Sequence, residues 1–356
     1  MKYVDELTFP AVAICNFNLH SRSATIHNGI SDLLEEMYTT YNPDFDKYDI
    51  DVTASEQFYR DTAHLFEYTF YAPTWQGNFL SKDDFTPILT DFGVCYTFNA
   101  GDGNDTHKVK NTGRSFGFSV YLNAVEFDYN IGPRQGLGFQ VMLYQQGDIP
   151  LVADLGFAVS VGEEVLVGVD VTSIQNLPPP HGSCGKKHLK YYDEYSRNAC
   201  RMECKTDYMV DYCGCRMFYM PGNATVCDFR VMYVCGQVAL AELMNEESRC
   251  ECPLPCTQVI YKPNLSHAKY TYQAFANFQA EYFGVPPEYF ESNLVKLHIF
   301  FQELAIHEVQ EEVAYNIFGL LCDIGGSLGL WLGGSILTVI EILDICFKGC
   351  CGSAWH

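Results

Sequence analysis

The chain has 356 residues with 22 Lys and Arg against 44 Asp and Glu, so its formal net charge is -22. This acidic balance argues against a nucleic-acid partner, because binding to phosphates needs clustered cations. Hydrophobic residues make up 48% and aromatic residues 15% of the chain, which excludes disorder and predicts about two folded units.

The first part of the chain predicts an extended start followed by helices. Apolar residues at helical spacing favour helices at Ile30 to Met37 and at Ser55 to Phe66, and we expect a third at Asp83 to Asp91. The middle of the chain is rich in alternating or β-branched runs separated by Gly, Asn and Asp, which predict strands. These runs are Cys95 to Asn99, Phe116 to Leu122, Gly138 to Tyr144, Leu155 to Val161 and Val165 to Val171.

Helices return after the proline-rich break at Leu177 to Cys184. We expect one helix from about Asp193 to Val210, which places Cys200 and Cys204 on one face, and another at Phe229 to Met244. A strand from Thr257, a further helix before Pro287 and a strand at Asn293 to Phe301 should follow.

Ten cysteines fall between Cys184 and Cys256, a density typical of a disulfide scaffold. A zinc site is the weaker alternative, because the spacings lack paired C-x2-C units. Three glycosylation sequons, at Asn104, Asn223 and Asn264, also indicate an oxidising, extracellular environment. Spacing alone does not choose the pairing of the cysteines.

The segment from Ile317 to Phe347 has 31 residues and three charges, which predicts a membrane span. Its six glycines between residues 319 and 334 would weaken a helix in water but suit close packing in a membrane. No earlier segment predicts a second span or a signal peptide. We therefore expect a membrane segment upstream of Met1.

Acidic residues and small polar residues lie on one face of this segment. If the helix is continuous, Asp323 and Glu341 are five whole turns apart, about 27 Å along the axis, and Ser327 and Thr338 share their face. Intramembrane acids indicate an ion path, and one span cannot enclose a pore, so a pore would require an oligomer. The alternative is an ordinary anchor whose acids reach the membrane surfaces.

Motifs of enzymes are weak. Gly113 to Gly117 and Gly325 to Gly329 match the nucleophile-elbow pattern, but the first lacks a strand-turn-helix frame and the second lies inside the predicted membrane span. His307 to Glu311 begins like a zinc-protease motif and lacks its second His, so we expect a solvated helix face there. We expect no enzymatic activity, cofactor or metal.

Five blocks of sequence together resemble the degenerin/epithelial sodium channel family, closest to its acid-sensing and peptide-gated branches. The blocks are Phe9 to Asn16 (FPAVAICN), Gly93 to Asn99 (GVCYTFN), Leu177 to Cys184 (LPPPHGSC), the ten-cysteine cluster with Cys213 to Gly222 (CGCRMFYMPG), and Leu321 to Ser335 (LCDIGGSLGLWLGGS). The resemblance covers almost the whole chain.

The resemblance implies an α+β membrane protein. Residues 1–312 would form a disulfide-rich extracellular domain, with a β-rich palm and β-ball, a helical finger and knuckle, and a thumb-like hairpin at about 184–256. Residues 313–347 would be the pore-lining transmembrane segment and 348–356 a short cytoplasmic tail. Three identical or related subunits in the lipid of the plasma membrane would pass sodium ions and be blocked by amiloride.

The resemblance also assigns roles to single residues. The selectivity filter falls on Gly333, Gly334 and Ser335, and the gate residue of the degenerin position falls on Cys322. Asp323, Ser327, Thr338 and Glu341 would line the pore path. The implied disulfides are Cys15 with Cys95, Cys184 with Cys256, Cys200 with Cys252, Cys204 with Cys250, Cys213 with Cys235, and Cys215 with Cys227.

The residues that would sense the stimulus depart from the acid-sensing pattern. In the acid-sensing branch, carboxyl groups of the finger and thumb lie in pairs, whose close approach raises a pKa. Here Glu126 and Asp128 match one member of such pairs, but the positions of their partners in the thumb are occupied by Gln237 and Ala241, which have no carboxyl group. Two other positions of the pattern carry His181 and His298, either of which could titrate near neutral pH. An extracellular ligand such as a peptide, a constitutive leak and mechanical gating therefore stand beside proton gating. The rival class is a single-span cell-surface receptor or adhesion protein.

Overall fold

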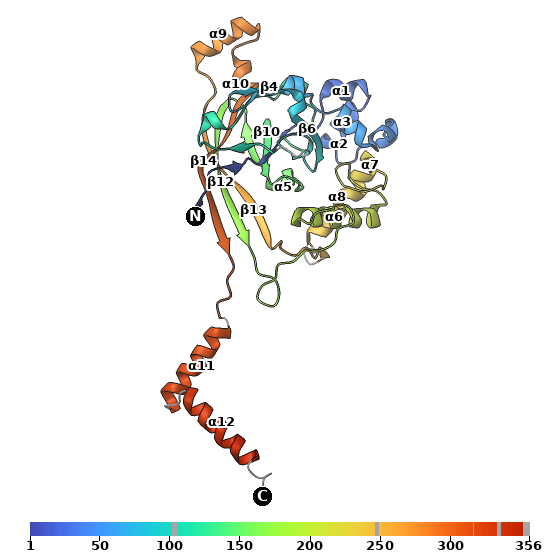
Figure 1. The fold of residues 1–356 in the computed structure, drawn as a ribbon. Coiled ribbons are helices and arrows are strands. Elements are labelled where there is room, and N and C mark those ends of the chain that lie inside the picture. The colour runs from blue at the N-terminus through green and yellow to red at the C-terminus, as the bar shows by residue number, and fades with distance from the viewer. Residues whose placement is uncertain (102–105, 246–248, 316, 333–335, 352–356) are drawn as a thin grey trace. The chain divides into compact units, whose positions relative to one another are not determined.

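The computed structural model describes residues 1–101, 106–245, 249–315, 317–332 and 336–351. The chain forms two compact units, Met1–Gln310 and Glu311–His356 (Figure 1). The first unit contains every strand among the described residues, and the second contains the helices α11 (Ile317–Leu332) and α12 (Ile336–Cys351).

The larger sheet of the first unit has seven strands among the described residues, in the order β13-β12-β14-β9-β4-β5, with β1 paired to β14. Its three longest strands are β12 (Glu163–Gln175), β13 (Thr257–Lys269) and β14 (Leu294–Gln310). β12 pairs in parallel with β14 and antiparallel with β13. The remaining strands are β1 (Lys2–Tyr3), β4 (Phe70–Trp75), β5 (Asn78–Phe79) and β9 (Phe118–Asn123).

A second sheet has the order β11-β10-β3-β7-β6, and β2 pairs with β8. Its strands are β3 (Ala11–Asn16), β6 (Phe85–Thr90), β7 (Gly93–Phe98), β10 (Gly138–Tyr144) and β11 (Phe157–Ser160), and the short pair is β2 (Leu7–Thr8) with β8 (Lys108–Val109).

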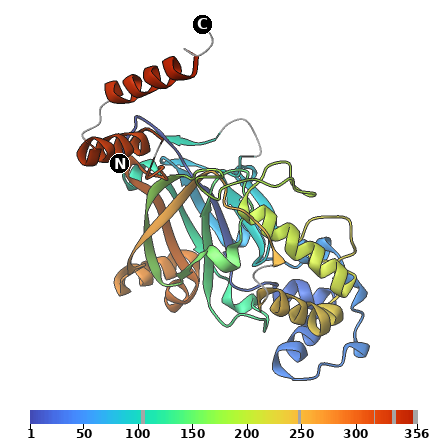
Figure 2. The ribbon, with the colours of Figure 1, turned by 90° about the horizontal axis from the view of Figure 1, so that it is seen from below.

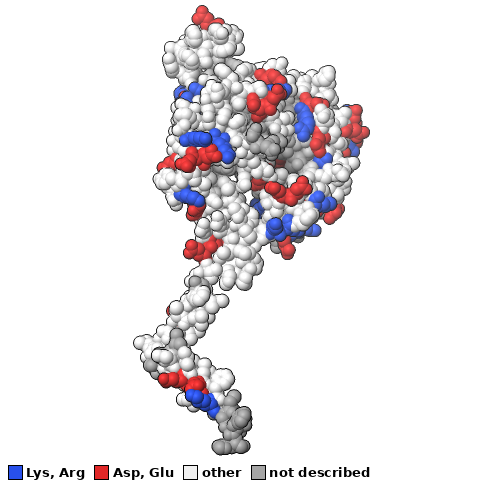
Figure 3. All heavy atoms as spheres, in the orientation of Figure 1, with Lys and Arg blue, Asp and Glu red and all other residues white. Residues whose placement is uncertain are grey.

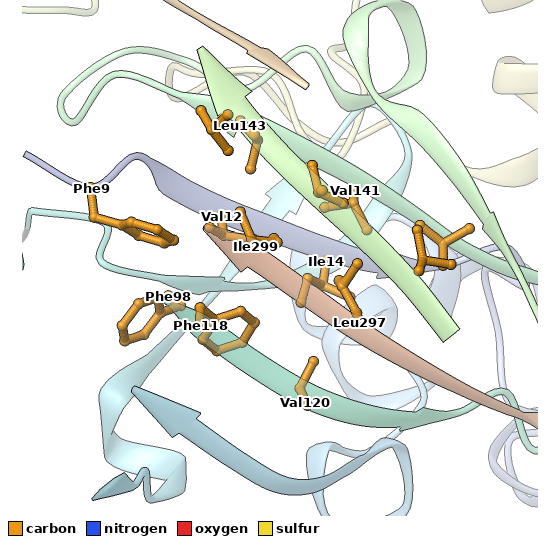
Figure 4. Packing of buried hydrophobic residues seen from close by; sticks show 14 of the residues in the cluster. Phe9, Val12, Ile14, Phe98, Phe118, Val120, Val141, Leu143, Leu297 and Ile299 are labelled. Atoms are coloured by element: carbon orange, nitrogen blue, oxygen red, sulfur yellow. The ribbon is translucent and has the colours of Figure 1, made fainter. Parts of the chain in front are cut away.

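The main hydrophobic core lies between the two sheets (Figure 4). The second sheet contributes Val12 and Ile14, and the larger sheet contributes Phe118, Leu297 and Ile299, all of which are buried. Alternate residues of a strand point to the same side of a sheet. The alternating apolar residues that predicted these strands are therefore the residues that form the core.

The predicted helix at Asp83 to Asp91 is wrong, because Phe85–Thr90 is strand β6, paired antiparallel with β7. β6 is the edge strand of its sheet, where Pro87 is tolerated because one side of the strand has no partner in the sheet. The helix predicted at Ser55 to Phe66 is shorter than expected, since α3 covers Glu56–Asp61 and α4 (Phe66–Thr69) begins only at the last residue of the predicted range. His307 to Glu311 is not a helix, since residues 307–310 belong to β14.

Short helices near the N-terminus pack against the cysteine-rich part of the chain. α1 (Arg22–His27) contacts α2 (Ser31–Thr39), and a buried cluster that includes Leu33, Tyr59 and Phe229 joins α2 to α7 (Phe229–Val231). The Tyr59 ring stacks on Phe218 with 3.7 Å between centroids. Other short elements are α5 (Val152–Leu155) and the 3-10 turns Phe45–Lys47, Asp51–Thr53, Lys82–Asp84, Arg114–Phe116 and Glu126–Asp128.

The cysteine-rich part is a helical hairpin of α6 (Arg197–Cys213) and α8 (Gln237–Asn245), with a π-helical turn at Met232–Gly236 before α8. Figure 2 shows α6 and α8 next to each other, to one side of the strands. Six disulfides join the same pairs that the resemblance implies: Cys15–Cys95, Cys184–Cys256, Cys200–Cys252, Cys204–Cys250, Cys213–Cys235 and Cys215–Cys227. α9 (Gln273–Phe283) and α10 (Glu288–Asn293) connect β13 to β14.

Candidate functional site

The two helices of the C-terminal unit expose most of their apolar side chains. Phe318 is 78% exposed and Trp331 83% exposed, whereas Phe118 and Phe139 in the first unit are 0% exposed. Each helix has 16 residues. Within the described part of the chain, no helix combines the length and the apolar character needed to cross a membrane. The span at 313–347 stays a prediction.

The four residues of the predicted pore path divide between these two helices. Asp323 and Ser327 lie on α11 and are four residues apart, which places them about 40° apart around the helix axis. Thr338 and Glu341 lie on α12, three residues apart and about 60° apart around its axis. The five-turn alignment of Asp323 with Glu341 required one continuous helix, and the structure describes two.

Asp323 is exposed, and its carboxylate accepts a hydrogen bond from the hydroxyl of Tyr315. Cys322, the predicted gate residue, has a free and exposed thiol, and so does Cys346. The predicted filter residues Gly333, Gly334 and Ser335 lie outside the described residues. Nothing lies within 4 Å of where a Cβ would be added at Gly325 or Gly326, so no described side chain packs on this face of α11.

A polar cluster lies on the larger sheet, where β12, β14 and the turn before β9 meet. The Glu164 carboxylate is 2.6 Å from an Arg114 guanidinium nitrogen, 3.5 Å from Lys296 Nζ and 3.2 Å from His298 Nε2. The parallel register of β12 and β14 sets Glu164 opposite Lys296, and the antiparallel register of β14 and β9 sets His298 opposite Ser119. We name Arg114, Glu164, Lys296 and His298 the palm cluster.

The palm cluster shifts the pKa values of its members in a consistent direction. Burial lowers the pKa of His298 to about 4, and the cations Arg114 and Lys296 add to this effect. Burial alone would raise the pKa of Glu164, but Lys296, Arg114 and His298 hold it below its usual value. At neutral pH the imidazole is therefore neutral and the carboxylate charged. The sequence singled out His298, but gave no signal for its three partners.

The residues that the resemblance assigns to the carboxyl pairs lie in two separate elements, and their role in sensing stays a prediction. Asp128 caps α1 by accepting hydrogen bonds from Ser21 Oγ at 2.5 Å and from the Ser23 amide at 2.8 Å. Gln237 and Ala241 lie on α8, and neither can ionise. No hydrogen bond between α8 and Asp128 occurs among the described residues. His181 is exposed in the loop that follows β12.

Of the three sequons, Asn104 lies outside the described residues. Asn223 is exposed in a turn, as an attachment site requires. Asn264 is exposed on β13, and its Nδ2 donates a hydrogen bond to Asp170 at 2.8 Å. Glycosylation at these positions stays a prediction.

The weak enzyme motifs do not form catalytic sites in the described structure. Arg114–Phe116 is a 3-10 turn leading into β9, which is not the strand-turn-helix frame of a nucleophile elbow. Gly117 instead allows two strands to approach, because a Cβ there would lie 2.1 Å from the carbonyl oxygen of Ile299. Within the described residues no three His, Cys, Asp or Glu side chains are placed to hold a metal ion.

Comparisons with known proteins agree with the resemblance seen in the sequence. The amiloride-sensitive sodium channel family matches residues 1–345. Acid-sensing ion channel 1C of Danio rerio is 32% identical over 375 residues, which cover 96% of this chain and 70% of that protein. Acid-sensing ion channel 1 of Gallus gallus is also 32% identical, over 96% of this chain and 71% of its own length. Acid-sensing ion channel 2 of Homo sapiens is 32% identical over 77% of this chain and 56% of its own length.

Proposed function

The chain belongs to the amiloride-sensitive sodium channel family and is a subunit of a gated, sodium-permeable cation channel, and from this premise we propose how its parts act. Residues 1–312 form the extracellular domain, 313–347 line the pore and 348–356 are cytoplasmic, in a plasma-membrane trimer of identical or related subunits. The six disulfides support an extracellular position for the first unit, because disulfides persist in oxidising compartments. A single-span receptor is not favoured, because the family match runs through residue 345.

The main support for the pore assignment is that α11 and α12 contain acidic residues on helices whose apolar side chains are exposed. Apolar side chains such as Phe318 and Trp331 need lipid or neighbouring helices around them. Asp323 and Glu341 would be costly against lipid, so they should face water in the ion path, together with Ser327 and Thr338. Gly333, Gly334 and Ser335 would then form the filter, with small residues that bring backbone carbonyls close to the ion.

The gate is assigned to Cys322, which directly precedes Asp323 in the sequence. The stimulus is extracellular, a proton or a ligand such as a peptide. Three relatives are named as acid-sensing channels, which supports protons. The incomplete carboxyl pairs weaken proton gating, and the palm cluster offers a group that takes up a proton only well below neutral pH.

The test is a voltage-clamp recording from cells that express the complete coding sequence, with acid, short peptides and amiloride applied in turn. We expect a sodium current that amiloride blocks. Cys322→Phe should hold the channel open without a stimulus, whereas Cys346→Phe, which enlarges the other free exposed cysteine, should leave gating unchanged. Asp323→Asn should reduce the sodium current.

Two outcomes would contradict the proposal. The first is the absence of sodium current from a Cys322→Phe protein that reaches the cell surface. The second is an equal effect of the substitutions at residues 322 and 346, because a general disturbance of the membrane segment would then explain both.

A further inference from the structure

A cavity of about 630 Å³ lies between α6, α8 and α5 in the cysteine-rich part of the first unit. One wall is basic and consists of Arg197, Arg201 and Lys205 from α6. The apolar part of the lining consists of Leu151, Tyr219, Leu240, Leu243 and Met244. Cys250 and Cys252 complete the lining, and their disulfides to Cys204 and Cys200 fix the cavity to α6.

The basic wall has an excess of unpaired charge. Arg197, Arg201 and Lys205 follow one another at intervals of four residues, so they share one face of α6. Lys205 pairs with Asp154 at 3.6 Å. Among the described residues, neither Arg197 nor Arg201 has a hydrogen bond or ion pair through its guanidinium, and Arg197 Nε is buried without an acceptor.

The stability of α6 does not explain these arginines. Arg197 is the first residue of the helix, where the helix dipole is positive and a cation is unfavourable. The first turn carries no acidic residue, and Ser196 Oγ already caps it by accepting from the Ala199 amide at 3.0 Å. The chain has a net charge of -22, yet among the described residues that line this cavity three are cations and one, Asp154, is a carboxylate. Figure 3 shows Lys and Arg side chains beside Asp and Glu side chains over this part of the first unit.

A bound anion would supply the hydrogen-bond acceptor that Arg197 and Arg201 lack among the described residues. An oxyanion can accept from both guanidiniums, and such charge-assisted hydrogen bonds are stronger than neutral ones. The same ligand would be favoured by the dipole at the start of α6. The wall formed by Leu240, Leu243 and Met244, the last of which is 68% exposed, is suited to an apolar body. We propose that this cavity binds an amphipathic organic anion, with its charged head on Arg197 and Arg201 and its apolar body along α8.

Octyl phosphate is a suitable probe, titrated into the full chain in lipid nanodiscs and followed by calorimetry, with empty nanodiscs subtracted. We expect Arg197→Gln with Arg201→Gln to weaken binding at least tenfold. Arg197→Lys with Arg201→Lys keeps the charge and should retain most of the affinity. Arg22→Gln with Arg60→Gln removes the same charge from exposed arginines on α1 and α3, and should change the affinity less than twofold.

Four further comparisons keep the proposal open to refutation even if the double variant folds poorly. Met244→Gln should weaken octyl phosphate but not inorganic phosphate. Binding of octylammonium as tightly as octyl phosphate would overturn the proposal, because the cations would then play no part. Equal binding of inorganic phosphate and octyl phosphate would overturn the role of the apolar wall. Equal losses in the two Arg→Gln double variants would show an effect of net charge alone. The channel assignment does not depend on any of these outcomes.

Discussion

The two units of the chain differ in the burial of their large apolar side chains. Phe118 in the first unit is 0% exposed between two sheets, whereas Phe318 in α11 is 78% exposed. In the first unit a buried core and six disulfides hold the strands and helices together. α11 and α12 have only 16 residues each, and isolated helices of that length are marginal in water.

This difference shows that folding alone covers the apolar surface of the first unit but not that of the second. The first unit removes its apolar surface from water by folding, and this burial is the main force that stabilises it. The second unit has the more apolar sequence but leaves its apolar surface uncovered. The proposed pore-lining role supplies what would cover that surface, namely lipid and neighbouring subunits.

The largest expected effect comes from a matched pair of phenylalanines. Phe118→Ala removes a buried ring from the core between the sheets and should lower the free energy of unfolding of the first unit by about 4 kcal/mol. Phe318→Ala removes an exposed ring and should change that free energy by less than about 0.5 kcal/mol. Denaturant unfolding of the full chain in detergent, followed by the circular dichroism of the sheets, measures both. Equal losses would show that the first unit depends on α11 for its stability.

Much of the first unit could be predicted from the sequence, because its strands follow short-range patterns. β10 forms where the run Gly138 to Tyr144 predicted a strand, and all of its residues are buried, including the polar Gln140. β6 could not be predicted locally, since its strand form depends on pairing with β7. The six disulfides followed from the family resemblance and not from the spacing of the cysteines.

The candidate sites were only partly visible in the sequence. In the palm cluster, Glu164 meets His298 because β12 and β14 pair in parallel, and Arg114 comes from the turn before β9, which pairs with the other side of β14. Parallel pairing connects strands that are far apart in sequence, and no local pattern announces it. The cavity beside α6 could have been suspected from the four-residue spacing of Arg197, Arg201 and Lys205. Its apolar wall comes from a different helix and required the fold.

The second prediction concerns pH and tests whether burial in the first unit controls its stability. Burial lowers the pKa of His64 to about 4, while Asp128 opposes this shift weakly, and in the unfolded chain the pKa is about 6.5. Above pH 6.5 neither state binds the proton. As the pH falls from 6.5 to 4 the unfolded state binds it first, so stability is lost over this window, by about 3 kcal/mol for this group.

His64→Gln should therefore flatten the decline of the free energy of unfolding between pH 6.5 and 4. A glutamine amide can still donate to Asn18 Oδ1, which lies 3.1 Å from His64 Nε2. His27→Gln, at an exposed histidine of α1, is the control and should leave the slope unchanged. Unfolding curves at a series of pH values measure the slopes, and identical slopes for both variants and the unchanged protein would contradict the prediction.

The smallest expected effect compares two ion pairs of the larger sheet. Glu164 in the palm cluster is 22% exposed and interacts with Arg114 at 2.6 Å, whereas Glu308 is 37% exposed and pairs with Lys2, which is 62% exposed, at 3.4 Å. Glu164→Gln leaves cations partly buried without their carboxylate and should cost about 1 to 2 kcal/mol. Glu308→Gln should cost less than about 0.5 kcal/mol, because water screens exposed pairs.

The depressed pKa of Glu164 means that its contribution to the free energy of unfolding is present above about pH 4.3 and is lost as the pH falls further. Unfolding curves at pH 7 and in acid therefore measure both the difference between the variants and its pH dependence. If the two variants were equally stable at pH 7, burial would not separate the palm cluster from the outer surface of the same sheet.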